Sequence, residues 1–273
     1  MTTRWRSRPP YTATVVRDRA DEFSTPVDWS SWYLTDEEDM GQSPEQDEIV
    51  QVFTSVLRQV GRELEWGKRV LIGNDAFFAW LPEHPLVRVS PDIYLLFDPP
   101  PPPLPASWQT WLHGHRPPAL AVEIVSGDEW KKDYEEGPEK YAQLGASELL
   151  IFDPAAMLEE GGDRLRLQVY QRTDDGLFVR QYAGPGTAAL KTLNLYALAC
   201  RTPAGPRLRL ARDREGIELV PTAEEAQDAA EAARQEAEAA RQEAEAARAA
   251  ERAAREEAER ELARLREQLG GRP

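Results

Sequence analysis

The most regular hydrophobic pattern lies in the segment SPEQDEIVQVFTSVLRQVGREL, which begins at Ser43. Ser43 suits an N-cap, Pro44 suits the first helical position, and the acidic Glu45 and Asp47 suit the positive end of a helix dipole. The apolar residues recur at helical spacing and are Ile49, Val52, Phe53, Val56, Leu57 and Val60. The pattern predicts an α-helix with one buried face.

Three segments rich in β-branched and aromatic residues follow, at 74–81, 87–97 and 120–126. This composition predicts three β-strands. Residues 99–105, with the sequence PPPPPLP, separate the last two segments. A proline run is stiff and lacks N–H donors, so we expect a spacer there and not a strand.

Residues 128–145 have a helical pattern that Gly137 and Pro138 interrupt. Gly145 is placed to cap the second half of this helix. Residues 147–154 then predict a buried strand that ends at Asp-Pro.

Two hairpins are expected beyond this strand. Residues 165–172 and 177–184 predict the first, with Asp175-Gly176 in its turn, and residues 208–220 predict the second. Helices and strands together predict an α/β domain with a mixed central sheet.

From Ala223 the composition changes to Ala, Glu, Arg and Gln with a seven-residue repeat. Such a repeat predicts a long helix whose apolar seam pairs in a coiled coil, and hence a homodimer through the C-terminal helix. Alanine buries little area, so a solitary helix held by Glu–Arg pairs is the alternative. The seam consists of Ala226, Ala230, Ala233, Ala237, Ala240, Ala244 and Ala247, and is continued by Leu262, Leu265 and Leu269.

These patterns divide the chain into three parts. Residues 1–40, rich in Trp, Pro and acidic residues, form an N-terminal extension that we expect to pack on the domain. Residues 41–221 form the globular α/β domain, and residues 222–270 form the Ala/Glu/Arg-rich helix.

Net charge argues against a generic nucleic-acid binder. The chain carries −15, of which the segment 222–273, with 14 acidic and 9 basic residues, contributes −5 and the rest −10. Proteins that bind nucleic acid through phosphate contacts are usually basic. A nuclease with clustered basic residues remains possible, and the clusters are Arg4, Arg6 and Arg8, then Lys131 and Lys132, then Arg201, Arg207, Arg209, Arg212 and Arg214.

Cysteine usage and hydropathy indicate a cytoplasmic protein without a membrane partner. Cys200 is the only cysteine, which excludes an internal disulfide and a thiolate zinc site and favours a reducing compartment. No apolar run approaches the roughly 20 residues that span a bilayer. The basic N-terminus lacks the apolar core of a secretory signal.

Asp92 and Glu123 are the most informative chemical residues, because each is a lone carboxylate at an apolar β-type segment. Burying a carboxylate costs roughly several kcal/mol unless something compensates it, and a divalent cation shared by two strands would do so. Mg²⁺ or Mn²⁺ held in this way suits phosphodiester hydrolysis. The alternatives are a turn residue after Pro91 for Asp92, and an edge-strand residue facing solvent for Glu123.

The order helix, strand, strand with Asp, strand with Glu, helix and strand resembles the αβββαβ core of the PD-(D/E)XK nuclease superfamily. Within it, the chain resembles the Uma-type putative restriction endonuclease family over roughly residues 40–222. The matching motifs are SPEQDEIV, VSPDIYLL, LAVEIVS and KYAQLGASELLIFDP. The resemblance implies a restriction-endonuclease-like fold in which Asp92 and Glu123 are metal ligands.

The superfamily pattern places a lysine two residues after the glutamate, where this chain has Val125. Uma-type members resemble this chain in carrying the lysine on the following helix, here Lys140. Its ammonium group would orient the attacking water or offset charge on the phosphate. Lys131 and Lys132 are the alternative lysines, and a solvated helical lysine is the alternative role for Lys140.

The superfamily often adds a third carboxylate from the first helix, which implies Glu48. Glu45 and Asp47 compete for this role, although acidic residues in a first turn commonly serve the helix dipole. We expect Tyr141, beside the lysine, to pack in the core. His113 and His115 lie in a Pro-rich loop without a third ligand nearby, which favours a surface loop over a metal site.

The sequence therefore predicts a metal-dependent endonuclease that cleaves DNA, with Asp92, Glu123, Lys140 and Glu48 as catalytic residues. A catalytically inactive nuclease-like scaffold that assembles through its coiled coil is the first alternative. A nucleic-acid-binding regulator without cleavage is the second, and the acidic charge disfavours it.

Overall fold

The computed structural model describes residues 14–16, 29–35, 43–126, 130–158 and 163–270, with the side chains of 14 and 267–270 excepted. Two compact units result, Met1–Ala223 and Glu224–Pro273. The second unit is the single helix α4, Ala223–Gly270, which confirms the helix predicted for the tail. Within the described residues, no helix combines the length and the apolar character needed to cross a membrane.

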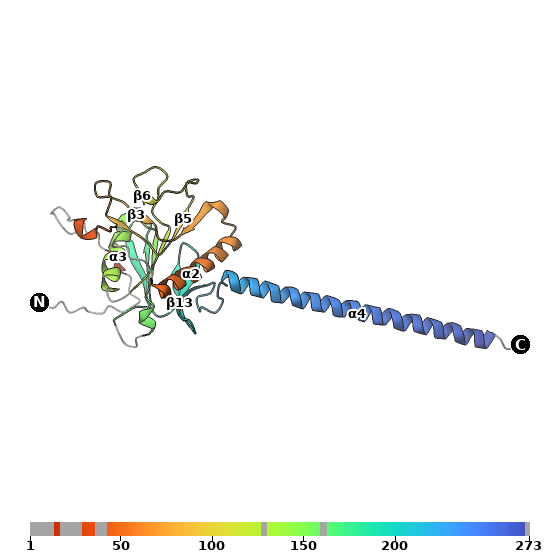
Figure 1. Ribbon diagram of the computed structural model, residues 1–273. Coiled ribbons are helices and arrows are strands. Elements are labelled where there is room, and N and C mark those ends of the chain that lie inside the picture. Colours follow the sequence, from red (N-terminus) through yellow and green to blue (C-terminus); the bar gives the residue numbers. More distant parts are fainter. Residues whose placement is uncertain (1–13, 17–28, 36–42, 127–129, 159–162, 271–273) are drawn as a thin grey trace. The chain divides into compact units, whose positions relative to one another are not determined.

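A mixed sheet of seven strands forms the centre of the first unit, in the order β1-β10-β9-β8-β7-β5-β2. Figure 1 shows this unit, in which β5 of the sheet is labelled. Strands β7 and β8 run parallel, and the other neighbouring strands are antiparallel. In this order the strand bounds are Thr14–Val15, Phe178–Gly184, Leu167–Arg172, Glu148–Phe152, Leu120–Ile124, Ile93–Phe97 and Val70–Gly73.

Two helices and four of these strands make up the predicted αβββαβ core. Helix α2 (Pro44–Glu63) precedes β2, β5 and β7, and helix α3 (Trp130–Leu144) precedes β8. Helix α2 begins as predicted, because the Ser43 side chain accepts a hydrogen bond from the backbone N–H of Gln46 at 3.2 Å. The fold is thus the mixed α/β arrangement expected from the sequence.

Smaller elements complete the unit. One three-stranded sheet comprises β11 (Ala188–Leu190), β12 (Leu195–Thr202) and β13 (Gly205–Ala211), and another comprises β3 (Phe77–Ala79), β4 (Arg88–Val89) and β6 (Ser107–Gln109). The short 3-10 helices are Trp29–Trp32, Gly67–Arg69 and Ala155–Met157.

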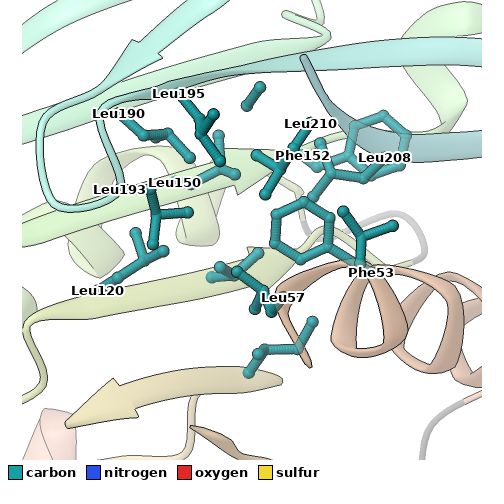
Figure 2. Close-up of a cluster of buried hydrophobic side chains, with 14 of the residues drawn as sticks. Phe53, Leu57, Leu120, Leu150, Phe152, Leu190, Leu193, Leu195, Leu208 and Leu210 are labelled. Atoms are coloured by element: carbon teal, nitrogen blue, oxygen red, sulfur yellow. The ribbon is translucent and has the colours of Figure 1, made fainter. Parts of the chain in front are cut away.

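Alternating side chains of the central sheet build a core on each of its faces. Ile93 and Leu95 of β5 pack with the buried face of α2 and with β11–β13, and we call this the α2-side core. Tyr94 and Leu96 pack with α3 and the β3–β4–β6 sheet, and we call this the α3-side core. Figure 2 shows the α2-side core, where Phe53 and Leu57 of the helix meet leucines from the strands.

Two predicted strands need correction between residues 70 and 97. The first core strand is β2, which ends at Gly73, whereas the predicted strand 74–81 contributes only β3 to a small sheet. The chain turns away at Asp75, whose φ is +49°, so one continuous strand cannot form. The predicted strand 87–97 divides into β4 and β5 at the bend Ser90-Pro91-Asp92, because proline cannot donate to the ladder.

Helix α3 continues through Gly137 and Pro138, so the predicted interruption is wrong. Proline inside a helix normally costs about 3 kcal/mol. Here Pro138 is buried and the flanking turns are held in the α3-side core, so tertiary packing offsets this cost. Gly145 ends the helix as expected, with φ +90° and its N–H donating to the Ala142 carbonyl.

The hairpin of β9 and β10 is confirmed, with Gly176 at φ +88° in its turn. The hairpin predicted at 208–220 forms only in part: β13 pairs along its length with β12, while Ala211 and Leu219 form an isolated antiparallel bridge and the Val220 N–H donates to the Leu210 carbonyl. Strand β12 was missed because alanines dilute its hydrophobic alternation.

Asp153, which ends β8, anchors α3 and the following turn from a fully buried position. Its carboxylate accepts hydrogen bonds from the Tyr134 hydroxyl at 2.7 Å and from the backbone N–H groups of Ala155 and Ala156. Arg164 forms a two-pronged ion pair with it, at 2.8 and 3.0 Å. The Asp-Pro after β8 therefore has a structural role, because Asp153 connects α3, the following turn and Arg164.

We expect Asp153→Asn to lower the free energy of unfolding by about 3 kcal/mol, because it leaves a buried guanidinium without its counter-charge. Urea denaturation followed by circular dichroism measures the change. Asp174→Asn is the matched control, since Asp174 is fully exposed and its ion pair with Lys191 is 3.9 Å long. Equal stability of the two variants would contradict the structural role of Asp153.

Candidate active site

Strand pairing brings Asp92 and Glu123 to the same place. Strands β5 and β7 are antiparallel with Ile93 opposite Val122, so the next position in this register sets Asp92 opposite Glu123. Opposite residues of an antiparallel pair share one face of the sheet. Strand β7 lies between β5 and β8, so Glu123 does not lie on an edge strand.

Hydrogen bonds from Ile124 and Gln46 hold the Asp92 carboxylate, which is only 8% exposed. The backbone N–H of Ile124 donates to Oδ2 at 2.6 Å, and the side-chain amide of Gln46 donates to Oδ1 at 3.0 Å. The same amide donates to the Ile124 carbonyl at 3.1 Å. Asp92 is therefore tied both to the strand that carries Glu123 and to the first turn of α2.

Glu123 is held from the other side of the site by α3. The Tyr141 hydroxyl donates to its Oε1 at 2.5 Å. Burial raises the pKa of Glu123 well above its usual range, and the negative charges of Asp92 and then Asp133 raise it further. Burial also raises the pKa of Tyr141, so this hydroxyl stays a donor. Two carboxylates thus lie close together in a largely desolvated place.

The chemistry of this pair fits a hard divalent cation. Burial and the neighbouring charge of Asp92 raise the pKa of Glu123, and a bound Mg²⁺ or Mn²⁺ would offset this repulsion between the two carboxylates. In the part of the chain that the structure describes, no group of three or more acidic, histidine or cysteine side chains is arranged for a metal. A two-carboxylate site suits Mg²⁺, which commonly keeps several waters.

Lys140 lies one residue before Tyr141, with its side chain 15% exposed. Its ammonium forms an ion pair with Glu136 at 3.3 Å and lies 5.6 Å from the centre of the Trp32 ring. Burial lowers the pKa of Lys140, whereas the negative charges of Glu136 and, less strongly, of Glu123 raise it. Lys140 is thus within electrostatic reach of Glu123, although its ion-pair partner is Glu136.

The alternative lysines lie on the first turn of α3. Lys131 and Lys132 are both exposed, and Lys131 lies 5.6 Å from the Trp130 ring centre. The positive charge of Lys132 contributes to the lowered pKa of Lys140, so these two cations are near each other. Of these lysines, Lys140 is the one with a recorded electrostatic interaction with Glu123.

Glu48 does not join this network through any interaction that the structure records. Its carboxylate forms an ion pair with Arg207 of β13, a guanidinium that is 6% exposed. Glu45 and Asp47 lie exposed in the first turn of α2. The α2 residue that contacts Asp92 is Gln46.

No site role was predicted for Gln46, because only the carboxylates Glu45, Asp47 and Glu48 were considered on this helix. A usable signal existed, since Gln46 lies three residues before Ile49 and seven before Phe53, on the buried face of the helix. Tyr141 is buried as expected, and it also binds Glu123, which no sequence pattern indicated.

The two histidines of the Pro-rich loop have different surroundings. His115 accepts a hydrogen bond from the Gln109 backbone N–H through Nδ1 at 2.9 Å and packs edge-on against Trp108. His113 is exposed. This agrees with the expected loop role.

We expect Gln46→Ala to weaken Mg²⁺ binding roughly tenfold, because residues that orient metal-binding carboxylates typically have effects of this size. Isothermal titration calorimetry measures the affinity. Gln59→Ala is the control, since Gln59 lies on the same helix and bonds only to exposed Arg62 and Glu63 in the recorded contacts. Unchanged affinity in Gln46→Ala would separate this amide from metal binding.

Comparisons with known proteins identify the family of the chain. The model of the Uma2 family, described as "Putative restriction endonuclease", matches residues 36–199, which is more than half of the chain. The crystal structure of a putative nuclease from Anabaena variabilis is similar at 13% identity and a TM-score of 0.39, covering 56% of this chain and 75% of that one. Comparison with curated proteins finds no match. The chain, which carries Asp92 and Glu123 inside the matched region, belongs to the Uma2 family of putative restriction endonucleases.

Proposed function

We propose that this protein is an endonuclease that hydrolyses DNA phosphodiester bonds with Mg²⁺ or Mn²⁺. The observation that carries the proposal is the hydrogen bond from the Ile124 N–H to Asp92, which fastens one acidic residue beside the strand position of the other. Family membership supports the nuclease class. The raised pKa of Glu123 supports a cation at the pair.

Asp92 and Glu123 would hold the cation. A bound divalent metal supplies Lewis acidity and lowers the pKa of coordinated water. The protein's part is orientation: Gln46 and the Ile124 N–H fix the Asp92 carboxylate, and Tyr141 fixes one oxygen of Glu123. These bonds fix the orientation of both carboxylates before a cation binds.

Lys140 would stabilise negative charge on the substrate phosphate or position the attacking water. Its ammonium lies 5.6 Å from the centre of the Trp32 ring and pairs with Glu136 of the same helix, so the charge is held on the α3 side of the site. Glu48 enters the proposal through its ion pair with Arg207, which anchors α2 to β13 and so supports the position of Gln46.

DNA as the substrate is consistent with the local charges despite the acidic chain. Lys131, Lys132 and Lys140 lie on one helix beside the acidic pair, where they would attract a phosphate backbone. The basic group Arg4, Arg6 and Arg8 lies outside the described residues. A cytoplasmic location stays a prediction from the single, half-buried Cys200.

Asp92→Asn and Glu123→Gln each should reduce the rate of plasmid nicking in Mn²⁺ by at least roughly 100-fold, because each removes a metal-binding charge. Mg²⁺ binding, measured by calorimetry, should be lost in both. The isosteric controls are Asp98→Asn and Glu83→Gln, which change exposed acidic residues. Cleavage by the wild type that persists in both site variants would remove the pair from the mechanism.

Lys140→Met should lower the cleavage rate by roughly 100-fold while leaving Mg²⁺ affinity within a few-fold of the wild type. The reason is that Lys140 carries charge for the substrate and not for the metal. Lys68→Met, which changes an exposed lysine far along the chain, serves as the control. A loss of metal binding in Lys140→Met would instead assign the residue a structural role.

A nuclease-like scaffold without catalysis is the second candidate. Val125 stands where the superfamily carries its lysine, and the recorded partner of Lys140 is Glu136, which together motivate this alternative. Calorimetric titration of the wild type with Mg²⁺ separates the two. Binding that vanishes in Asp92→Asn favours the enzyme, and absence of binding favours the scaffold.

A further inference from the structure

We infer that helix α4 pairs with the α4 of a second copy of this chain, and that the two helices run parallel and in register. This goes beyond the nuclease proposal and does not depend on it. The inference rests on where charged residues lie beside the alanine seam of a helix whose side chains from Gln227 to Arg266 are exposed in the described structure.

Helix α4 presents every side to solvent. All residues from Gln227 to Arg266 are exposed, and Leu262 and Leu265 are 51% and 52% exposed. A long helix of this kind is held either by ion pairs along its own surface or by a partner helix. The exposed leucines at its end favour a partner, because apolar side chains of that size gain by burial.

The alanine seam defines heptad positions. Ala230, Ala237 and Ala244 fall at a, and Ala226, Ala233, Ala240 and Ala247 fall at d. The neighbouring e positions are then Arg234, Arg241 and Arg248, and the g positions Glu236 and Glu243. Over this stretch each edge of the seam carries one sign of charge, Arg on the e edge and Glu on the g edge.

This separation selects the orientation of the partner. In a parallel pair each g residue meets the e residue five positions later on the other chain, so Glu236 meets Arg241 and Glu243 meets Arg248. In an antiparallel pair g meets g and e meets e, which sets Glu against Glu and Arg against Arg. Parallel pairing forms four ion pairs per dimer, and antiparallel pairing forms none at these positions.

The same pattern identifies the partner as another copy of this chain. A helix with Arg along one edge of its seam and Glu along the other is complementary to an identical helix related by a two-fold axis. Alanine at both a and d lets the helices approach closely, which brings e and g side chains over the seam. Since alanines contribute little buried area, these charges carry a large share of the specificity.

Ion pairs within the helix compete only weakly. Arg241 contacts Glu245 at 3.0 Å, with both side chains more than 60% exposed. This pair runs from Arg to Glu along the chain, which is the less favourable direction for a helical pair. Arg241 is therefore available to a glutamate of the second helix.

The first experiment measures the mass of the full-length protein by sedimentation equilibrium. We expect twice the 30.8 kDa of one chain. Arg241→Glu combined with Arg248→Glu should weaken the dimer roughly tenfold or more. Arg252→Glu combined with Arg260→Glu makes the same change of charge away from the e edge and should leave the dimer intact.

Circular dichroism checks that α4 stays helical in both double variants. A wild-type protein that is monomeric at all concentrations measured, or that has three or more chains, would overturn the proposal. Equal weakening by the two double variants would overturn the assigned edge.

The second experiment tests orientation by disulfide crosslinking in a Cys200→Ser background. Ala230→Cys and Ala254→Cys, tested separately, should each form a crosslinked dimer on mild oxidation. In an antiparallel pair, identical residues meet only at the two-fold axis, so two positions this far apart cannot both crosslink. Ala246→Cys, at position c outside the seam, should stay uncrosslinked.

A crosslink at neither seam position, or at only one, would overturn the parallel arrangement. Neither experiment uses cleavage as its readout, so its outcome is independent of the proposed nuclease activity.

A parallel pair also has a consequence for the site. Because each α4 starts where its globular unit ends, both units would be tethered at the same end of the coil, and two sites would be available to one duplex.

Discussion

The hydrogen bond from the Ile124 backbone N–H to the Asp92 carboxylate is the constraint on which the candidate site depends. It fastens an acidic side chain at the start of β5 to the strand that carries Glu123. The negative charge of Asp92 raises the pKa of the neighbouring Glu123, and burial raises it further, so having both carboxylates charged is unfavourable. The fold tolerates this unfavourable arrangement because Gln46 and Tyr141 hold the pair from two helices. Such conflict between electrostatics and packing is typical of functional sites.

The two cores explain why the helices can perform this holding. Helix α2 is fixed by Phe53 and Leu57 in the α2-side core, and its first turn therefore reaches the sheet at a defined point (Figure 2). Helix α3 is fixed by Leu144 in the α3-side core and by the bond from Tyr134 to Asp153. Because rigid elements pack on both faces of the sheet, the polar side chains at its end are held in a well-defined geometry.

Local patterns sufficed for elements that carry their own signals. Ser43 with a helical apolar period marked α2, and the turn at Gly176 marked the hairpin. Predictions failed where packing outweighs local preference: Pro138 lies inside a helix because its neighbours are buried. The site followed the same division. Asp92 and Glu123 were identifiable as carboxylates among apolar residues, whereas the hydrogen bonds of Gln46 depend on contacts 46 and 78 residues away.

By itself, the amino-acid order determined the helices α2 and α4, the hairpin of β9 and β10, the candidate acidic pair and the charge edges of the tail, because each depends on residues near one another in the chain. Only the tertiary structure decided which polar groups touch. In the folded chain Glu48 pairs with Arg207 and Gln46 bonds to Asp92, although Glu48 and Gln46 lie in the first turns of the same helix. The physical reason is that hydrogen bonds demand separations near 3 Å, and these are set by how helices and sheet pack and not by position in the sequence.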